Sequence, residues 1–252
     1  MTGRLVLLTG ASRGLGAALA RRLLAADLTL LCLSRHADES LTAAAEAADA
    51  KLEQWRVDLA DPGPVAARVE DWLNRFAADR FAAATLINNA GALAPLGPLG
   101  SADSASLQAA LRVGLEAPLL LSAAFLRATA AWRTDRRILN VSSGLGRRAM
   151  AGQATYCAAK AGMDHLSRVL ALEEAGRDRG ARIVSLAPGV IDTDMQVQLR
   201  GADAGAFADR ATFVQLKESG QLVSADATAE RVLAYLARAD FGSTPVADVR
   251  DA

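Results

Sequence analysis

A glycine-rich turn between a strand and a helix, near the start of the chain, limits the possible folds more than any other feature. Residues 4–9 form a continuous apolar run, which is typical of a parallel strand buried on both faces. The turn itself is Gly10-Ala11-Ser12-Arg13-Gly14-Leu15-Gly16, and alanines and leucines that favour a helix follow it. An ordinary turn is the alternative. The strand, turn and helix in this order favour an anion site, because glycines let the backbone approach a pyrophosphate at the helix N-terminus.

A tyrosine and a lysine four residues apart are the second informative feature. In Tyr156-Cys157-Ala158-Ala159-Lys160 the two side chains project from the same face of a helix. A cation beside a phenol stabilises the phenolate, so we expect a lowered pKa for Tyr156 and a role in proton transfer. Ser143 precedes the tyrosine by thirteen residues and completes a candidate catalytic group.

Composition excludes several other classes of protein. Lysine plus arginine and aspartate plus glutamate both number 28 in 252 residues, so no overall field would attract nucleic acid or a membrane surface. Cys32 and Cys157 are the two cysteines, and no C-x-x-C or histidine-rich spacing predicts a metal site. No secretion signal is recognised, and we expect a cytoplasmic protein that is not bound to a membrane.

The pattern of elements predicts a doubly wound α/β fold. After the first strand and helix, strands are expected at residues 28–33, 52–57, 84–87, 137–141 and 182–186, with a seventh near Val246. Helices are expected at 39–48, 62–78, 104–132, 153–177 and 225–239. Alternating strands and helices give a parallel sheet with helices on both faces, here within a single domain that spans residues 1–252.

The combination of motifs resembles the classical short-chain dehydrogenases/reductases, a family with a Rossmann fold. The resemblance is carried by Thr9 with the glycine turn of spacing G-x-x-x-G-x-G, by Asn88-Asn89-Ala90-Gly91, by Ser143, Tyr156 and Lys160, and by Pro188-Gly189. It extends from about residue 4 to about residue 240. Within the family, Ser34-Arg35 and Leu115-Glu116-Ala117-Pro118 are more similar to sepiapterin and benzil reductases than to acyl-carrier ketoreductases.

The resemblance implies a nicotinamide cofactor and a reaction. Hydride is transferred to a carbonyl carbon, Tyr156 donates a proton, Ser143 binds the carbonyl oxygen, and Lys160 lowers the tyrosine pKa and holds the nicotinamide ribose. The implied cofactor contacts, besides Tyr156 and Lys160, are Gly10, Ser12, Arg13, Gly14, Leu15, Gly16, Ser34, Arg35, Asp58, Leu59, Asn89, Ala90, Gly91, Pro188, Gly189, Val190, Ile191 and Thr193. Turn chemistry alone is another explanation for Asn89.

Two arginines favour NADP(H) over NAD(H). An acidic residue at the end of the second strand usually marks NAD, whereas this chain has Ser34-Arg35 there. Arg13 in the glycine turn is a second guanidinium that could reach a 2′-phosphate, to which it can donate two parallel hydrogen bonds.

One position departs from the family pattern. Many relatives carry an asparagine where this chain has Gly114, within Val113-Gly114-Leu115. Pro118 lacks an N–H and would leave the Gly114 carbonyl free, so we interpret the change as an altered proton relay in a working enzyme. The alternative is an NADP(H)-binding sensor or scaffold with little turnover.

Substrate and partners are constrained only broadly. Residues 193–223 mix Phe207, Phe213 and Leu216 with charges and glycines, as expected of a mobile substrate cover. A diketone or a bulky aromatic ketone is the preferred substrate. The two long helices are apolar on more than one face and resemble those that form a four-helix interface in dimers or tetramers; a monomer with a thicker cover is the alternative.

The basic pairs have separate interpretations. Arg21-Arg22 and Arg136-Arg137 are expected on solvated surface. For Arg147-Arg148, which lies between the serine and the tyrosine, contact with an anionic substrate stays open beside solvated surface.

Overall fold

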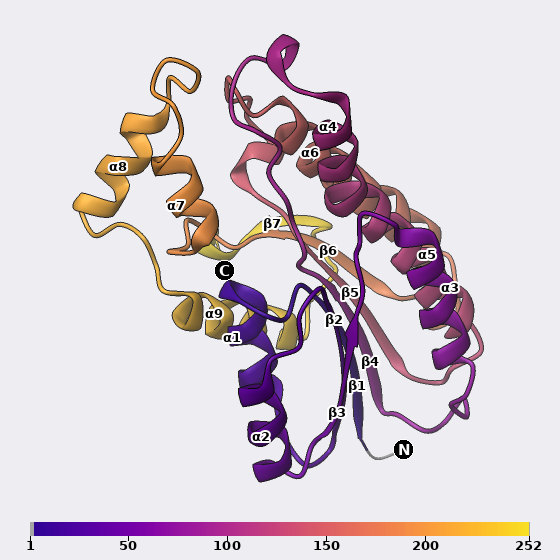
Figure 1. Cartoon of the computed structure of the whole chain (residues 1–252). Helices are drawn as coiled ribbons and strands as arrows, with labels where there is room; N and C mark the ends of the chain where they lie inside the picture. Colours follow the sequence, from indigo (N-terminus) through magenta and orange to yellow (C-terminus); the bar gives the residue numbers. More distant parts are fainter. Residues whose placement is uncertain (1–2, 252) are drawn as a thin grey trace.

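A parallel sheet of seven strands runs through the computed structural model, which describes residues 3–251 (Figure 1). Its order is β3-β2-β1-β4-β5-β6-β7, which confirms the predicted doubly wound Rossmann fold. The strands are β1 (Arg4–Thr9), β2 (Leu28–Ser34), β3 (Lys51–Arg56), β4 (Ala83–Asn88), β5 (Asp135–Val141), β6 (Arg182–Ala187) and β7 (Val246–Asp248).

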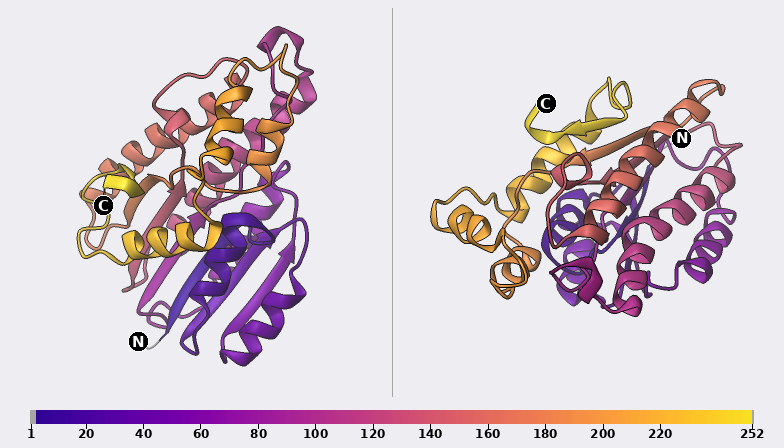
Figure 2. Two further views of the ribbon diagram at one scale, coloured as in Figure 1. Left: turned by 90° about the vertical axis from the view of Figure 1, so that its left-hand side faces the viewer. Right: turned by 90° about the horizontal axis from the view of Figure 1, so that it is seen from above.

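Helices cover both faces of this sheet (Figure 2). They are α1 (Gly14–Leu23), α2 (Glu39–Ala47), α3 (Pro62–Leu73), α4 (Ser104–Leu111), α5 (Ala117–Ala128), α6 (Ala154–Ala175), α7 (Asp194–Arg200), α8 (Arg210–Glu218) and α9 (Ala225–Ala237). One face is packed by α1, α2 and α9, and the other by α3, α5 and α6.

Strand β1 supplies side chains to both cores, as its unbroken apolar run predicts. Val6 and Leu8 join the cluster under α1 and α9, whereas Leu5 and Leu7 join the cluster under α3 and α5. Successive side chains of a strand point to opposite faces, so a strand buried twice must be apolar at every position.

The strand order reverses between β1 and β4, and this reversal decides where a ligand can bind. β1 pairs with β2 on one side and with β4 on the other, so the loops after β1 and β4 lead away in opposite directions. Ligands of open α/β sheets bind in the crevice outside the strand ends at such a point. The glycine turn follows β1, and Asn89-Ala90-Gly91 follows β4.

Two predicted helices end several residues earlier than expected, whereas the ends of the others lie within two residues of the prediction. The helix predicted over 62–78 stops at Leu73, because Phe76 leaves the helical path and packs edge-on against Trp72 and Phe81. The helix predicted over 104–132 runs only to Ala128, where Thr129 donates its hydroxyl proton to the Phe125 carbonyl at 2.7 Å.

The expectation that Arg136 is solvated was wrong. Its side chain is only 4% exposed and forms an ion pair with the equally buried Glu174 of α6 at 3.3 Å. It also donates a 2.9 Å hydrogen bond to the carbonyl oxygen of Arg179. A buried guanidinium requires such partners, and these lie about 40 residues away in the sequence.

The predicted substrate cover, 193–223, contains α7 and α8 and a small core of its own. Leu199, Phe207 and Phe213 are buried together, with Leu93 and Met150 packed against them. The two ends of the segment meet, because Asp192 N–H donates to Val223 O at 2.8 Å and Val223 N–H donates to Val190 O at 3.0 Å. Its mobility stays a prediction.

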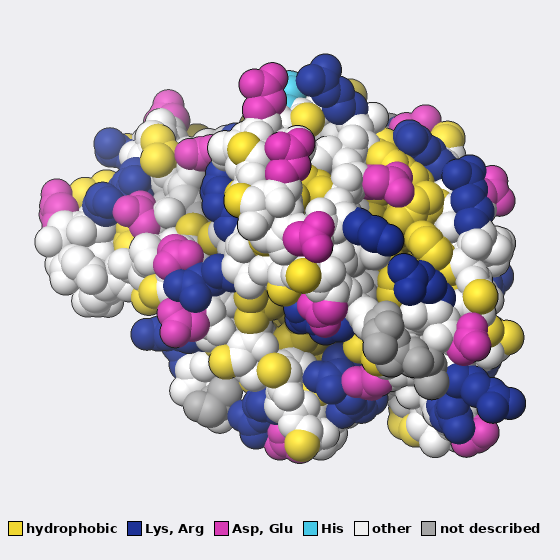
Figure 3. All heavy atoms as spheres, turned by 90° about the horizontal axis from the view of Figure 1, so that it is seen from below, with side chains coloured by type: hydrophobic (Ala, Val, Ile, Leu, Met, Phe, Trp, Pro, Cys, Tyr) yellow, Lys and Arg dark blue, Asp and Glu magenta, His cyan; other side chains and the backbone are white. Residues whose placement is uncertain are grey.

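One stretch of helix, Ser104–Ala128, is long and apolar enough by composition to cross a membrane, with mean hydropathy 1.6. Its α5 part packs against α3 and β4, so we interpret it as a core helix. On the face of the molecule shown in Figure 3, basic and acidic side chains are interspersed.

Candidate active site

A cleft of about 640 Å³ lies at the carboxyl ends of the strands, where the strand order reverses. This volume is in the usual range for small-molecule sites. The cleft gathers all the residues that the sequence analysis selected for catalysis or cofactor binding: Gly10, Ser12, Arg13, Gly14, Leu15, Gly16, Ser34, Arg35, Asp58, Leu59, Asn89, Ala90, Gly91, Ser143, Tyr156, Lys160, Pro188, Gly189, Val190, Ile191 and Thr193.

Each glycine of the turn is required for a steric reason. Gly10 and Gly14 have φ of 69° and 53°, which L side chains rarely adopt. A Cβ on Gly16 would lie 2.0 Å from the Gly10 carbonyl oxygen, so only glycine lets α1 start so close to the turn. The turn therefore presents bare backbone at the start of a helix, which fits a phosphate group.

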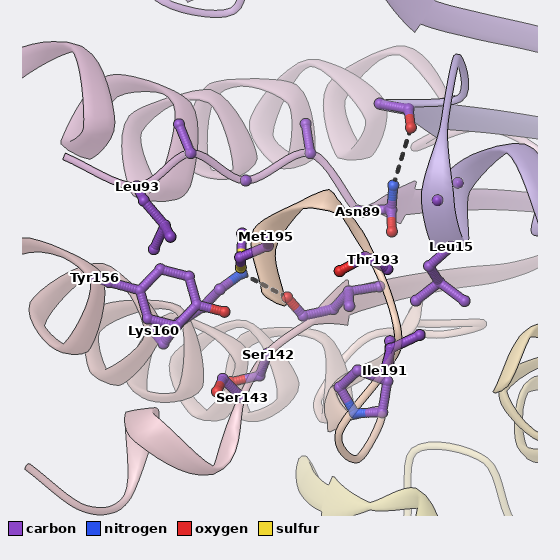
Figure 4. Close-up of a pocket in the computed structure, with 18 of the residues that line it drawn as sticks. Leu15, Asn89, Leu93, Ser142, Ser143, Tyr156, Lys160, Ile191, Thr193 and Met195 are labelled. Carbon is purple, nitrogen blue, oxygen red and sulfur yellow. Dashed lines mark hydrogen bonds between the residues drawn. The ribbon is translucent and has the colours of Figure 1, made fainter. Parts of the chain in front are cut away.

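Asn89 holds the glycine turn from the neighbouring strand. Its Nδ2 donates to the carbonyl oxygens of Thr9 at 3.0 Å and Gly10 at 3.2 Å, as Figure 4 illustrates with one dashed line. In return, Thr9 Oγ1 accepts hydrogen bonds from the backbone N–H groups of Asn89 and Ala90, both at 2.9 Å. Ser34 accepts from the Ala11 N–H at 3.0 Å, so the turn is braced from both sides.

Helix α6 carries Tyr156 and Lys160 into the same part of the cleft, with Ser143 from the loop after β5 nearby (Figure 4). Lys160 is 4% exposed, and its Nζ donates a 2.7 Å hydrogen bond to the Val141 carbonyl oxygen at the end of β5. The same Nζ lies 5.6 Å from the centroid of the Tyr156 ring.

The expected lowering of the Tyr156 pKa was wrong. Burial raises the pKa of Tyr156, and a hydrogen bond with Ser143 opposes that rise. Burial also lowers the pKa of Lys160 to about 8, and the nearby Asp164 carboxylate opposes that fall. Desolvation thus disfavours both charged forms, and it is the largest influence on each pKa.

Gly114 lies in a π-helical turn, Arg112–Glu116, between α4 and α5. The Ala117 N–H donates to the Arg112 carbonyl five residues back, and Pro118 has no N–H to continue the α-helical ladder. A Cβ on Gly114 would lie 3.1 Å from the Cβ of Ala159, the residue before Lys160. Close packing against Ala159 is therefore enough to explain the glycine at this position, without a loss of catalytic activity.

A family model described as short chain dehydrogenase matches residues 4–204 of the chain. The chain belongs to the short-chain dehydrogenase family. It is accordingly an oxidoreductase, and the cofactor of this family is NAD or NADP.

Several individual proteins resemble this short-chain dehydrogenase along nearly its whole length. A benzil reductase ((S)-benzoin forming) of Bacillus cereus is 34% identical over 94% of this chain and 96% of its own. A sepiapterin reductase of Xenopus tropicalis is 33% identical over 92% of this chain and 90% of its own. A solved short-chain dehydrogenase/reductase of Burkholderia vietnamiensis is 37% identical, with TM-score 0.66, over 98% and 97% of the two chains. These relatives confirm the resemblance to benzil and sepiapterin reductases.

The cleft of this short-chain dehydrogenase fits the family's cofactor. No side chain caps the N-terminus of α1, so its first backbone N–H groups can serve an anion. A Cβ on Gly16 would collide with the Gly10 carbonyl oxygen and with Asn89 Nδ2, so the turn must stay free of a side chain there. Among residues 3–251, no cluster of three histidine, cysteine, aspartate or glutamate side chains could hold a metal ion.

Two arginines of the cleft are placed differently from each other. Arg13 forms an exposed ion pair with Asp194, the first residue of α7, at 3.1 Å. Arg35 is exposed beside the end of β2 and lines the cleft. Arg13 would have to leave Asp194 in order to reach a phosphate.

The side chains of Arg147 and Arg148 lie in different places. Arg147 turns toward α6 and donates to Asp164 at 3.1 Å and to the Ala247 carbonyl at 2.9 Å, whereas Arg148 lines the cleft. Contact with a substrate thus stays open for Arg148 alone.

Asp164 was not predicted from the sequence as a residue of the site. It lies one turn beyond Lys160 on α6 and is buried. Its position four residues after the lysine, on the same helical face, was a signal available in the sequence.

Proposed function

We propose that the protein is a cytoplasmic, NADPH-dependent reductase that converts a ketone or diketone to an alcohol. The observation that carries this proposal is the meeting of Tyr156, Lys160 and Ser143 with the braced glycine turn in one cleft. When bound there, the cofactor supplies the hydride that adds to the carbonyl carbon.

Tyr156 is proposed to donate the proton to the carbonyl oxygen. Because burial raises its pKa, the phenol stays protonated at neutral pH and is ready to act as an acid. Ser143 would hydrogen-bond the same oxygen and stabilise negative charge as it develops. Reduction therefore suits the protonation state of this site better than oxidation.

Lys160 is proposed to fix the ribose of the cofactor and to add positive charge beside the phenol. Its hydrogen bond to the Val141 carbonyl oxygen, at the end of β5, holds the ammonium in place. Gly91 also faces it, since a Cβ there would lie 4.0 Å from Nζ. The lysine thus stands between the loops after β4 and β5, where it could donate to a hydroxyl group in the cleft.

The remaining contacts are proposed from the family resemblance, and all of these residues line the cleft. Ser12, Gly14 and Leu15 would face the pyrophosphate, and Asp58 and Leu59 the adenine. Asn89, Ala90 and Gly91 would pass under the adenosine ribose, and Pro188, Gly189, Val190, Ile191 and Thr193 would face the nicotinamide. Arg35 and Arg13 would bind a 2′-phosphate, which favours NADP(H), and Ser34, which braces the turn, would line this end.

The substrate end of the cleft supports a bulky apolar carbonyl compound. Leu93, Met150, Met195 and Phe213, which belong to one apolar cluster, line the cleft together with Tyr156. Such surfaces bury ring systems well. The name of the Bacillus cereus relative, a benzil reductase, is in keeping with an aromatic diketone.

A dimer or tetramer is proposed through the outer faces of α5 and α6. These helices expose Leu119, Val169 and Leu172, the last at 78% of its surface. Exposed apolar side chains on adjacent helices are typical of a protein interface.

The proposal is tested by a panel of diketones, aromatic ketones and pterins, assayed by loss of NADPH absorbance with purified enzyme. We expect turnover with at least one aromatic diketone and NADPH. Tight NADPH binding without oxidation by any carbonyl compound would overturn the proposal and favour a sensor.

A further inference from the structure

Asp164 is a buried carboxylate near Tyr156 and Lys160, and it has no role in the reaction proposed above. It follows Lys160 by four residues on α6, and it is 2% exposed. A carboxylate in such a place is costly unless its oxygens are paired, so its partners reveal what it holds together.

Three side chains converge on it, two from the segment after β5 and one from β6. Oδ1 accepts hydrogen bonds from Ser142 Oγ and Ser185 Oγ, both at 2.6 Å. Oδ2 accepts from Arg147 Nε at 3.1 Å. Ser142 immediately precedes Ser143 and Arg147 follows it by four residues, so Asp164 holds both ends of the segment that carries the proposed oxyanion donor.

The backbone of this segment also lies directly on α6. A Cβ on Gly146 would stand 2.9 Å from Asp164 Oδ2 and 3.0 Å from the Lys160 carbonyl oxygen. Arg147 additionally donates to the Ala247 carbonyl oxygen at 2.9 Å, which anchors the segment to β7. Segment 142–147 is therefore located by α6, the helix that carries Tyr156 and Lys160.

We propose that Asp164 is a positioning residue that sets the distance between Ser143 on its loop and Tyr156 and Lys160 on α6. This inference rests on the proposed reduction, in which Ser143 and Tyr156 must reach the same carbonyl oxygen. Small misplacements of such groups reduce rates strongly, about 100-fold for 1 Å. An apolar residue could fill the space, but it could not hold Ser142 and Arg147 together.

The test is Asp164→Asn, which keeps the shape and an acceptor oxygen for the serines but turns an amide NH2 donor toward the Arg147 guanidinium, itself a donor. Glu174→Gln is the matched control, because Glu174 lies on the same helix, is 3% exposed and is paired to Arg136 at 3.3 Å, far from the cleft. Arg147→Gln removes the same ion pair from its more exposed partner and serves if Asp164→Asn does not fold.

We expect Asp164→Asn to lower kcat about 10- to 100-fold with the Kd for NADPH within about threefold, and Glu174→Gln to leave kcat unchanged. In a Ser143→Ala background, the same Asp164→Asn change should cost little, because it acts through Ser143. An equal loss in both backgrounds, or an equal loss in the Glu174→Gln control, would overturn the inference.

Amide hydrogen exchange separates this inference from the proposed function. Asp164→Asn, but not Glu174→Gln, should speed exchange at Leu145, Gly146 and Arg147. If the unaltered enzyme reduces no carbonyl compound while this difference in exchange is seen, Asp164 does hold the segment in place and the proposed function fails. Unchanged exchange of the segment would contradict the positioning role even in an active enzyme.

Discussion

The Lys160 ammonium is joined to the Val141 carbonyl oxygen by a 2.7 Å hydrogen bond, which ties the helix bearing Tyr156 to the end of β5. The buried lysine has a pKa of about 8, far below its ordinary value of 10.5. Its protonation state thus changes close to neutral pH.

We predict an alkaline limb near pH 8 in kcat/KM for NADPH, which reports ionisations of the free enzyme. Lys160 must be charged to act on the ribose and the phenol, whereas the pKa of Tyr156 is raised by burial. Asp164 of α6 opposes the lowering of the Lys160 pKa by burial. Any activity that remains in Lys160→Arg should lack the limb, since arginine stays charged; a limb that persists there would contradict the assignment.

The same lysine should make stability depend on pH. Its folded pKa lies below its unfolded pKa, so the unfolded chain binds more protons between about pH 8 and 10.5. Burial of the charged lysine lowers the free energy of unfolding by the full amount below pH 8. The free energy of unfolding then rises by about 3 kcal/mol in all as pH increases through this window. Urea unfolding of Lys160→Met should lack this rise. A difference between the two proteins that is flat from pH 7 to 10.5 would refute it.

Gly16→Ala is predicted to disrupt the glycine turn. The new Cβ would meet the Gly10 carbonyl oxygen at 2.0 Å and Asn89 Nδ2 at 2.6 Å, so the turn must open. We expect at least about 100-fold weaker NADPH binding by fluorescence titration, with a loss of stability of about 2 kcal/mol or more. Gly63→Ala is the control, because nothing lies within 4 Å of its Cβ, and it should bind NADPH normally.

Arg35→Ala is predicted to weaken NADPH binding about 10- to 100-fold and to leave NADH binding nearly unchanged, as expected for a lost charge-assisted hydrogen bond. Arg13→Ala should act in the same direction. Since it also breaks the ion pair with Asp194, Asp194→Asn is measured beside it. An unaltered preference in Arg35→Ala would remove the argument for NADP(H).

Gly114→Asn tests whether the missing asparagine weakens the enzyme. Its Cβ would press on Ala159 at 3.1 Å and displace the neighbouring Lys160. We therefore expect kcat to fall rather than rise. A gain in turnover of orders of magnitude would show that the native chain is a weakened relative.

Local features of the chain were predictable from sequence. The glycine turn is specified by residues within one strand–turn–helix unit, and the Tyr156–Lys160 pair by helical spacing. The other residues expected in the cleft, such as Asp58 and Thr193, came from the resemblance to a family and not from local chemistry. Asp164 was missed because its partners Ser142 and Ser185 lie about 20 residues away on either side and meet only in the folded sheet. The prediction that Arg136 is exposed failed for the same reason, because its partner Glu174 is distant in sequence.

The pKa of Tyr156 could not be predicted from spacing either. A neighbour four residues away fixes the direction of a charge interaction, but desolvation depends on how tightly the whole cleft closes around the phenol. Here desolvation is the larger effect.

The central claim is that Tyr156 gives a proton to the oxygen of a carbonyl group being reduced. Single-turnover stopped-flow with prebound NADPH and an aromatic diketone measures this step in the unaltered enzyme and in Tyr156→Phe. We predict that the variant binds NADPH with nearly the same Kd but oxidises it about 100- to 10,000-fold more slowly. Oxidation at an unchanged rate in Tyr156→Phe would contradict the account.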